Sequence, residues 1–151
     1  MKDITIDYDN CVINIRVGAI IKKNNFVLLC RTINDNFWFL PGGRVKTMES
    51  SKSAIIRELN EEIGEKYKFE DYYIFSENFF IHKDRKFHEY CTYFNVSWNN
   101  NIENSFINGK EEFKWFEIKR LSEIVVKPTF IVKFIQNKNK ENCFISHNEI
   151  E

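Results

Sequence analysis

The segment from Gly43 to Gly64 constrains the fold more than any other part of this 151-residue sequence. It begins with a glycine turn and a loop, and from Ser50 or Ser51 onward it has the pattern of an amphipathic helix that ends at Gly64. Successive helical residues advance by about 100°, which gathers aliphatic side chains on one side and acidic side chains on the other. The aliphatic group is Ile55, Ile56, Leu59 and Ile63, and the acidic group is Glu58, Glu61 and Glu62. The segment therefore predicts a helix over about residues 50–63.

Repulsion among these three glutamates favours a bound cation over a merely solvated helix face. A surface helix often carries acidic residues that have no function. Carboxylates three and four positions apart lie roughly 6 Å from each other, and each pair repels by about 3 kcal/mol at an effective dielectric near 20. Arg57 is placed to pair with Glu61 or to reach back to Glu49, but one cation leaves an excess of negative charge. Such oxygen ligands are typical of magnesium sites, where the ion also binds substrate phosphates.

The remaining sequence predicts a layered domain of strands and helices. Short apolar runs predict strands over residues 12–21, 26–30, 37–40, 72–81, 87–98 and 113–118. Pro41-Gly42-Gly43 is expected to end the third strand, and residues 99–110 are expected to form an asparagine-rich loop. An amphipathic pattern predicts a second helix over about residues 128–137, with Pro128 in its first turn. Hairpin-linked strands interleaved with two helices indicate an α+β or α/β domain with a mixed sheet.

Length, charge and the cysteine pattern limit the organisation of the chain. We expect one domain over residues 1–137 and a polar, frayed tail over residues 138–151, in which residues 143–145 can dock as a short strand. The 22 basic and 22 acidic side chains cancel, so neither nucleic acid nor a membrane is an expected partner. The sequence shows no signal peptide and no apolar run long enough to span a membrane, which predicts a cytoplasmic location. Four dispersed cysteines are expected to be free thiols.

The segment resembles the signature of the Nudix hydrolases, which reads Gly, five residues, Glu, seven residues, and then Arg-Glu-aliphatic-x-Glu-Glu-x-Gly-aliphatic. Only the last position departs from it, because Glu65 stands where the family has an aliphatic residue. The resemblance covers about residues 12–136 and implies the Nudix α/β/α sandwich with a mixed, partly barrel-like sheet. The matching residues are Gly43, Glu49, Arg57, Glu58, Leu59, Glu61, Glu62 and Gly64.

The same resemblance implies roles for residues of the segment, which we call the Nudix box. It implies Mg²⁺ as the cofactor, with Mn²⁺ as a substitute, and Arg57 and Glu49 as residues that hold the metal ligands in position. The general base is left open between Glu61 and a glutamate of a later strand, either Glu112 or Glu111. The implied metal ligands are Glu58, Glu61, Glu62 and the backbone carbonyl of Gly42 or Gly43.

By this resemblance the reaction is hydrolysis of a nucleoside diphosphate linked to another group, with water attacking phosphorus. Signatures of the ADP-ribose and diadenosine polyphosphate subfamilies are missing, which leaves nucleoside triphosphates or nucleotide sugars as the small-molecule substrate. Two alternatives stay open: a nucleotide-sensing Nudix domain without hydrolysis, and an isomerase of the isopentenyl-diphosphate type that would use Cys30. Relatives are often dimers, so a homodimer is also left open. The candidate substrate contacts are Arg31, Phe37, Arg44 and Glu89.

Overall fold

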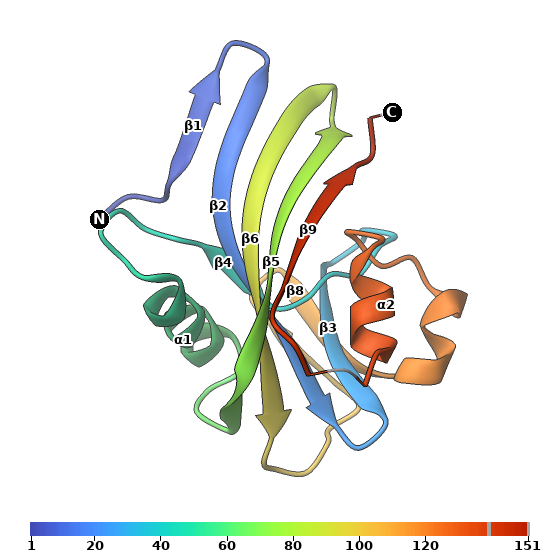
Figure 1. Ribbon diagram of the computed structural model, residues 1–151. Helices are drawn as coiled ribbons and strands as arrows, with labels where there is room; N and C mark the ends of the chain where they lie inside the picture. Colours follow the sequence, from blue (N-terminus) through green and yellow to red (C-terminus); the bar gives the residue numbers. More distant parts are fainter. Residues whose placement is uncertain (139, 151) are drawn as a thin grey trace.

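The structure is a computed structural model that describes residues 1–138 and 140–150 (Figure 1). Its elements are β1 (Thr5–Tyr8), β2 (Cys11–Lys23), β3 (Phe26–Thr32), β4 (Gly42–Arg44), α1 (Ser51–Glu62), β5 (Tyr67–His82), β6 (Arg85–Trp98), β7 (Ser105–Asn108), β8 (Glu111–Glu117), the 3-10 helix η1 (Ile118–Glu123), α2 (Ile131–Gln136) and β9 (Cys143–Asn148). No helix among these described residues is long and apolar enough to cross a membrane.

The strands form one mixed sheet in which β2 is the central element. The order is β7-β8-β3-β2-β6-β5-β9, and both β1 and β4 pair with β2 outside this path. The pairs β2–β6 and β5–β9 are parallel, and the other pairs are antiparallel. The mixed sheet that the sequence predicts is therefore confirmed. Because β2 pairs with four strands, it positions most of the surfaces that surround the site.

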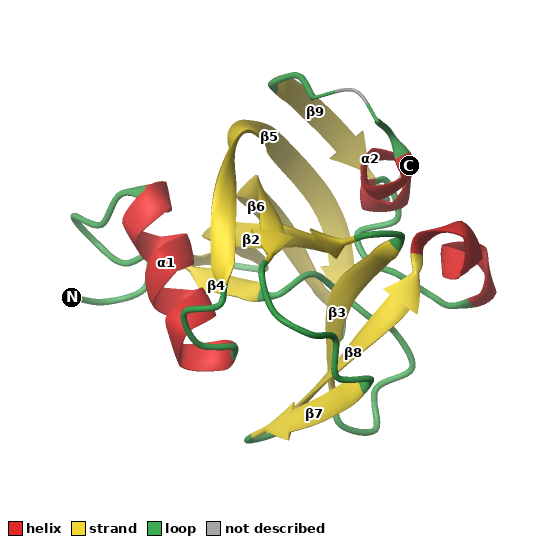
Figure 2. Cartoon of the chain, turned by 90° about the horizontal axis from the view of Figure 1, so that it is seen from below, coloured by secondary structure: helices red, strands yellow, loops and turns green. Residues whose placement is uncertain are grey.

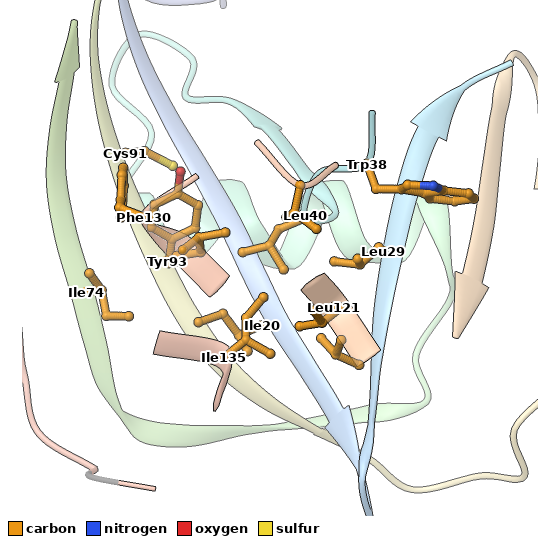
Figure 3. Close-up of a cluster of buried hydrophobic side chains, with 13 residues drawn as sticks. Ile20, Leu29, Trp38, Leu40, Ile74, Cys91, Tyr93, Leu121, Phe130 and Ile135 are labelled. Atoms are coloured by element: carbon orange, nitrogen blue, oxygen red, sulfur yellow. The ribbon is translucent and has the colours of Figure 1, made fainter. Parts of the chain in front are cut away.

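Helices cover both faces of the sheet, which gives the α/β/α sandwich (Figure 2). One core cluster joins Ala54, Ile55 and Leu59 of α1 to odd-numbered positions of β2. The other cluster joins Ile131 and Ile135 of α2 to the opposite face of the sheet, and Figure 3 shows it with residues of β2, β5 and β6 around Ile135. Alternation of side chains along β2 separates the two cores.

The box helix lies where its sequence pattern predicts it. Helix α1 spans Ser51–Glu62, and the hydroxyl of Ser50 accepts a hydrogen bond from the Ser53 amide at 3.1 Å, which satisfies one of the free donors of the first turn. Gly64 follows the helix with φ +80°, and its amide donates to the Leu59 carbonyl at 3.1 Å. This left-handed glycine stops the helix directly after the acidic face.

The strand predicted over residues 37–40 is wrong in its position. Phe39 makes only an isolated bridge to Cys30, and Trp38 makes another to Val126. The strand lies instead at Gly42–Arg44, where β4 pairs with β2. A Cβ at Gly42 would lie 2.1 Å from the Val17 carbonyl oxygen, so the absence of side chains lets the glycine pair join the sheet.

Three further segments differ from the sequence-based expectation. Helix α2 spans Ile131–Gln136 and starts later than predicted, because the Lys127 amide bonds the Trp38 carbonyl and holds this part of the chain extended. The loop predicted over residues 99–110 contains β7, which pairs with β8. In the predicted tail, Cys143–Asn148 forms β9 beside β5 (Figure 1), while residues 139 and 151 lie outside the described residues.

Candidate active site

The glycine turn brings the backbone of β4 against the acidic face of α1. A Cβ at Gly43 would lie 2.3 Å from the carboxyl carbon of Glu58, so this position accommodates glycine without displacing the carboxylate. The backbone of Gly42 donates a hydrogen bond to the Glu62 carboxylate. The two glycines therefore hold the backbone in direct contact with two of the predicted metal ligands.

Arg57 organises the other side of the box. Its Nε and Nη2 donate to the two Glu49 oxygens at 2.8 and 2.9 Å, and its Nη1 donates to Glu58 Oε1 at 2.5 Å. Nη2 also reaches the Arg44 carbonyl at 3.1 Å. This paired geometry lowers the pKa of Glu49 to about 2, and the amide of Lys46 adds a further hydrogen bond to that carboxylate. Arg57 and Glu49 therefore form a clamp between the loop and the helix.

Glu62 lies in the opposite electrostatic situation. Burial, followed by the charges of Glu111 and Glu58, raises its pKa to about 8. Its Oε2 atom is buried and has no hydrogen-bond partner among the described residues. The pKa of Glu111 is also raised, by burial first and with a contribution from the charge of Glu58. A partly buried group of carboxylates with an unfilled acceptor offers oxygen donors that a cation could satisfy.

The donor set fits a hard divalent ion, although the side chains do not stand as a finished cage. No group of three or more His, Cys, Asp or Glu side chains in residues 1–138 and 140–150 converges on one point. Arg57 draws the Glu58 carboxylate toward Glu49, and the Glu61 side chain is 61% exposed and lies 4.0 Å from Arg57. Oxygen donors with an unfilled Glu62 atom suit Mg²⁺ or a similar ion, which prefers carboxylates and retains water ligands.

The two glutamates at the start of β8 lie in different environments. Glu111 interacts electrostatically with Glu58 and Glu62, whereas Glu112 accepts a hydrogen bond from Arg31 Nε at 2.8 Å. The Arg31 guanidinium also lies over the Trp38 ring, 4.5 Å from its centroid. Successive side chains of a strand alternate between faces, so the structure brings Glu111 to the box carboxylates and pairs Glu112 with Arg31.

A cavity of about 360 Å³ lies on the α2 face of the sheet, beside the box. Three of the four predicted substrate contacts, Phe37, Arg44 and Glu89, line it, and Arg31 is not among its lining residues. The Lys127 ammonium lies 4.9 Å from the centre of the Phe37 ring at the same cavity wall. The cavity thus combines cationic and aromatic groups on its walls.

Sequence reasoning missed several polar residues of this cavity, among them Asn14, Arg16 and Asn78 on the strands of the sheet. Arg16 Nε lies 4.0 Å from the Glu89 carboxylate, and Arg16 also interacts electrostatically with Glu58 and Glu62. It therefore connects the cavity to the box. A signal was present, because polar residues two positions apart interrupt an otherwise apolar strand and so must share one face.

The cysteines are placed differently from the expectation of an isomerase-like alternative. Cys30 is fully buried, and burial raises the pKa of its thiol well above the usual range. Cys91 is the cysteine that lines the cavity, and its pKa is also raised by burial. Figure 3 shows its sulfur next to the Tyr93 hydroxyl, to which it is hydrogen-bonded. Cys30 and Cys91 are therefore both held as neutral thiols, which are poor nucleophiles.

Comparisons with known proteins agree with this architecture. A relative from Proteus vulgaris named 8-oxo-dGTP diphosphatase is 35% identical over 60 residues, which are 37% of this chain and 54% of the relative. The chain therefore spans about half the length of the curated relative that it matches. The mutator MutT protein from Bacillus halodurans has a TM-score of 0.63 at 13% identity, with 89% of each chain covered. A NUDIX hydrolase from Nitrosomonas europaea has a TM-score of 0.64 at 20% identity, covering 95% of this chain and 81% of the other.

At these identities the two solved structures show a shared fold. The family assignment comes from the sequence profile described as NUDIX domain, which matches residues 13–137. This match includes the box, most of the central strand β2, both α-helices and the strand β8 that carries Glu111. The chain belongs to the NUDIX domain family.

Proposed function

We propose that this protein is a Mg²⁺-dependent hydrolase that cleaves the diphosphate bond of a nucleoside diphosphate linked to another group. The observation that carries the proposal is the buried, unpartnered Oε2 of Glu62 within a group of carboxylates beside a nucleotide-sized cavity. Hydrolases of this family generally use a divalent metal ion. The family match and the carboxylate donors support the same cofactor, with Mn²⁺ as a substitute.

In this proposal the box residues hold the ion. Glu58, Glu61 and Glu62 are its carboxylate ligands, and the backbone carbonyl of Gly42 or Gly43 completes the set. When bound, the ion neutralises phosphoryl charge and lowers the pKa of bound water. The clamp between Arg57 and Glu49 keeps the carboxylates at the end of the glycine turn, and its hydrogen bonds at 2.8 and 2.9 Å support this role.

A carboxylate near the box receives the proton of the attacking water. Glu61 and Glu111 are the two candidates supported by position, because both lie next to the other acidic groups of the site. Burial raises the pKa of Glu111, which makes its carboxylate a stronger proton acceptor. Glu112 is a weaker candidate than its neighbour, since the hydrogen bond from Arg31 engages its carboxylate.

The cavity binds the nucleotide portion of the substrate. Arg16 and Arg44 are placed to meet phosphate oxygens, because they line the cavity and lie close to the box. Phe37 with Lys127 offers an aromatic and a cationic contact on another wall. The name of the Proteus vulgaris relative supports nucleoside triphosphates as the substrate class. Nucleotide sugars are the second class.

Release of phosphate and pyrophosphate tests the proposal. The panel consists of nucleoside triphosphates, their oxidised forms, ADP-ribose, nucleotide sugars and dinucleotides, each with Mg²⁺ and with chelator. The same panel is run with the Glu61→Gln/Glu62→Gln double variant. We expect turnover that requires Mg²⁺ and is lost in the variant. A folded protein that binds Mg²⁺ and nucleotides without turning over any compound would support the nucleotide-sensing alternative instead.

A further inference from the structure

Three polar residues form a row across the cavity wall. On the parallel pair β2–β6, Asn14 is the register partner of Glu89, and on the antiparallel pair β6–β5, Glu89 is the register partner of Asn78. Neighbouring strands lie about 4.8 Å apart, and all three side chains line the same cavity. The three residues of the row therefore lie side by side in the wall of the cavity.

The row offers hydrogen-bond acceptors that the protein leaves unfilled. Asn14 is 2% exposed and Asn78 is 6% exposed, and neither Oδ1 atom has a hydrogen-bond partner in the part of the chain that the structure describes. The Asn14 side-chain amide interacts with the Glu89 carboxylate, which lies between the two asparagines. Buried acceptors without partners are costly to maintain. A ligand with several adjacent donors would remove that cost.

The row stands between two groups of different chemistry. Arg16 lies two residues beyond Asn14 along β2, on the side of the box. Phe80 and Phe87 lie two residues from Asn78 and Glu89 on the other side, and their rings stack at 5.0 Å within the lining of the cavity. A nucleotide whose phosphates lie at Arg16 and the box therefore has its base within reach of the row and beside an aromatic surface.

We propose that Asn14, Glu89 and Asn78 select a guanine-type base by accepting hydrogen bonds from its N1–H and N2–H₂ groups. This inference rests on the proposed nucleotide function and specifies its substrate. Guanine alone among the common bases presents two neighbouring N–H donor groups on its pairing edge. The Glu89 carboxylate accepts one hydrogen bond from N1–H and one from the amino group. The free Asn14 and Asn78 oxygens remain for the second amino hydrogen. Hydrogen bonds to a charged acceptor are roughly twice as strong as neutral ones.

The other bases place an acceptor against the same carboxylate. Adenine and cytosine each combine one amino donor with a ring nitrogen acceptor, and uracil places its single N–H between two carbonyl groups. With each of these bases, an acceptor atom of the base would face an acceptor oxygen of Glu89 or of an asparagine. A site built to receive donors rejects ligands that lack them, because its buried polar groups then remain unpaired.

Binding of nucleoside monophosphates to the full chain tests this selectivity without any hydrolysis. Calorimetric titrations with GMP, IMP and AMP are made in the presence of a chelator. IMP keeps N1–H and lacks the amino group, so it is a matched ligand. We expect AMP to bind about 10- to 100-fold more weakly than GMP, with IMP between them. 8-Oxo-GMP keeps both donors and is expected to satisfy the row as GMP does.

Variants of the row identify the residues responsible. Glu89→Gln exchanges one acceptor for a donor, and Asn78→Leu removes an acceptor at similar volume. Both are expected to weaken GMP binding about 10-fold or more and to leave AMP binding within about twofold. Asn95→Leu is the matched control, because Asn95, on β6, is a buried asparagine as Asn78 is on β5. The Asn95 side chain donates a hydrogen bond to the Tyr72 carbonyl and does not line the cavity. This variant tests the general cost of replacing a buried amide, and the ratio of GMP to AMP affinity should stay unchanged.

The outcomes separate this inference from the proposed function. Equal binding of GMP and AMP, or a GMP preference that persists in Glu89→Gln and Asn78→Leu, overturns the inference while hydrolysis is still measured independently. Weaker binding of UDP-glucose but not of GMP in the variants would assign the row to a sugar instead. A row-dependent GMP preference without hydrolysis of any triphosphate would sustain the inference and defeat the proposed function. If a variant unfolds, the ratio of IMP to GMP affinity of the wild-type chain still decides whether the amino group is recognised.

Discussion

Two glutamates of the Nudix box, Glu49 and Glu62, show opposite electrostatic behaviour. Two donors of Arg57 and the amide of Lys46 contact the carboxylate of Glu49, whose pKa falls to about 2. Glu62 has one oxygen without a partner in the described chain, and its pKa rises to about 8. Hydrogen bonds from Arg57 lower the pKa of Glu49, whereas burial, followed by the charges of Glu111 and Glu58, raises the pKa of Glu62. The hydrogen-bonded carboxylate of Glu49 holds the loop against the helix, whereas the free oxygen of Glu62 is suited to a cation.

The largest effect is expected from removing the charge of the unsatisfied carboxylate. Glu62→Gln should lower kcat/KM about 10²- to 10⁴-fold, because a metal ion contributes several kcal/mol to transition-state stabilisation. Thermal stability of the metal-free protein should not fall, since burial and the neighbouring carboxylates already disfavour the charged form of Glu62. Steady-state kinetics and thermal unfolding measure the two effects. Glu65→Gln, at an exposed position just beyond the helix, is the control. Ordinary activity of Glu62→Gln would remove Glu62 from the ligand set.

Two glycine substitutions separate the site from the helix end. Gly43→Ala places a methyl group 2.3 Å from the Glu58 carboxyl carbon, so the carboxylate must move, and activity should fall about 100-fold with little unfolding. Gly64→Ala meets no atom within 4 Å but strains a residue with φ +80°, so it should cost about 1 kcal/mol of stability and keep activity. Reversal of this pattern would mean that Gly43 serves the fold and not the carboxylates.

A smaller effect, on both activity and stability, is expected at Glu49, whose carboxylate oxygens are hydrogen-bonded. Glu49→Gln keeps the shape of the side chain but loses the charge-assisted pairing with Arg57. Activity should fall about 10-fold because the clamp orients other ligands. The free energy of unfolding should fall by about 1 kcal/mol, a modest value because solvent screens the pair. Urea unfolding and kinetics on the same sample check this combination. Loss of activity as large as in Glu62→Gln would place Glu49 at the metal itself.

The effect of pH is graded and is expected to be at most tenfold in affinity, or about 1.4 kcal/mol in stability, for each pH unit. A folded-state pKa of about 8 at Glu62 means that the folded protein binds a proton that the unfolded chain releases near 4.5. The contribution of Glu62 to stability is therefore complete below pH 4.5 and declines as pH rises toward 8, by at most about 1.4 kcal/mol per unit. Mg²⁺ must displace this proton, so its affinity should rise up to tenfold per unit between pH 6 and 8. Titration calorimetry should show a flat profile in Glu62→Gln; an equally steep one assigns the proton elsewhere.

The box was predictable from the sequence because its geometry is local. Helical spacing places Glu58, Glu61 and Glu62 on one face, and the capping residue Ser50 and the stop at Gly64 fix the ends. Local pattern also indicated the paired strands β5 and β6. These features depend on residues that are neighbours in the chain, so periodicity is sufficient to locate them.

The cavity was less predictable because register between distant strands creates it. Asn14, Glu89 and Asn78 become neighbours only through pairing of β2, β6 and β5. Arg31 looked suitable because it precedes the glycine turn, yet alternation along β3 directs it to Glu112 and Trp38. A single sequence contains no measure of register, and a shift of one residue would reverse every face.

The central strand β2 also fixes the distance between the positions of the site that lie along it. Gly18 opposite the glycine turn, Arg16 at the box side of the cavity and Asn14 in the polar row follow one another in steps of two residues. Each step is roughly 6.7 Å, so about 13 Å separates the first position from the last. Covalent geometry determines this length, and no side-chain rotation alters it. Point substitutions can therefore change which groups are accepted at either end, while the distance between these positions of β2 stays the same.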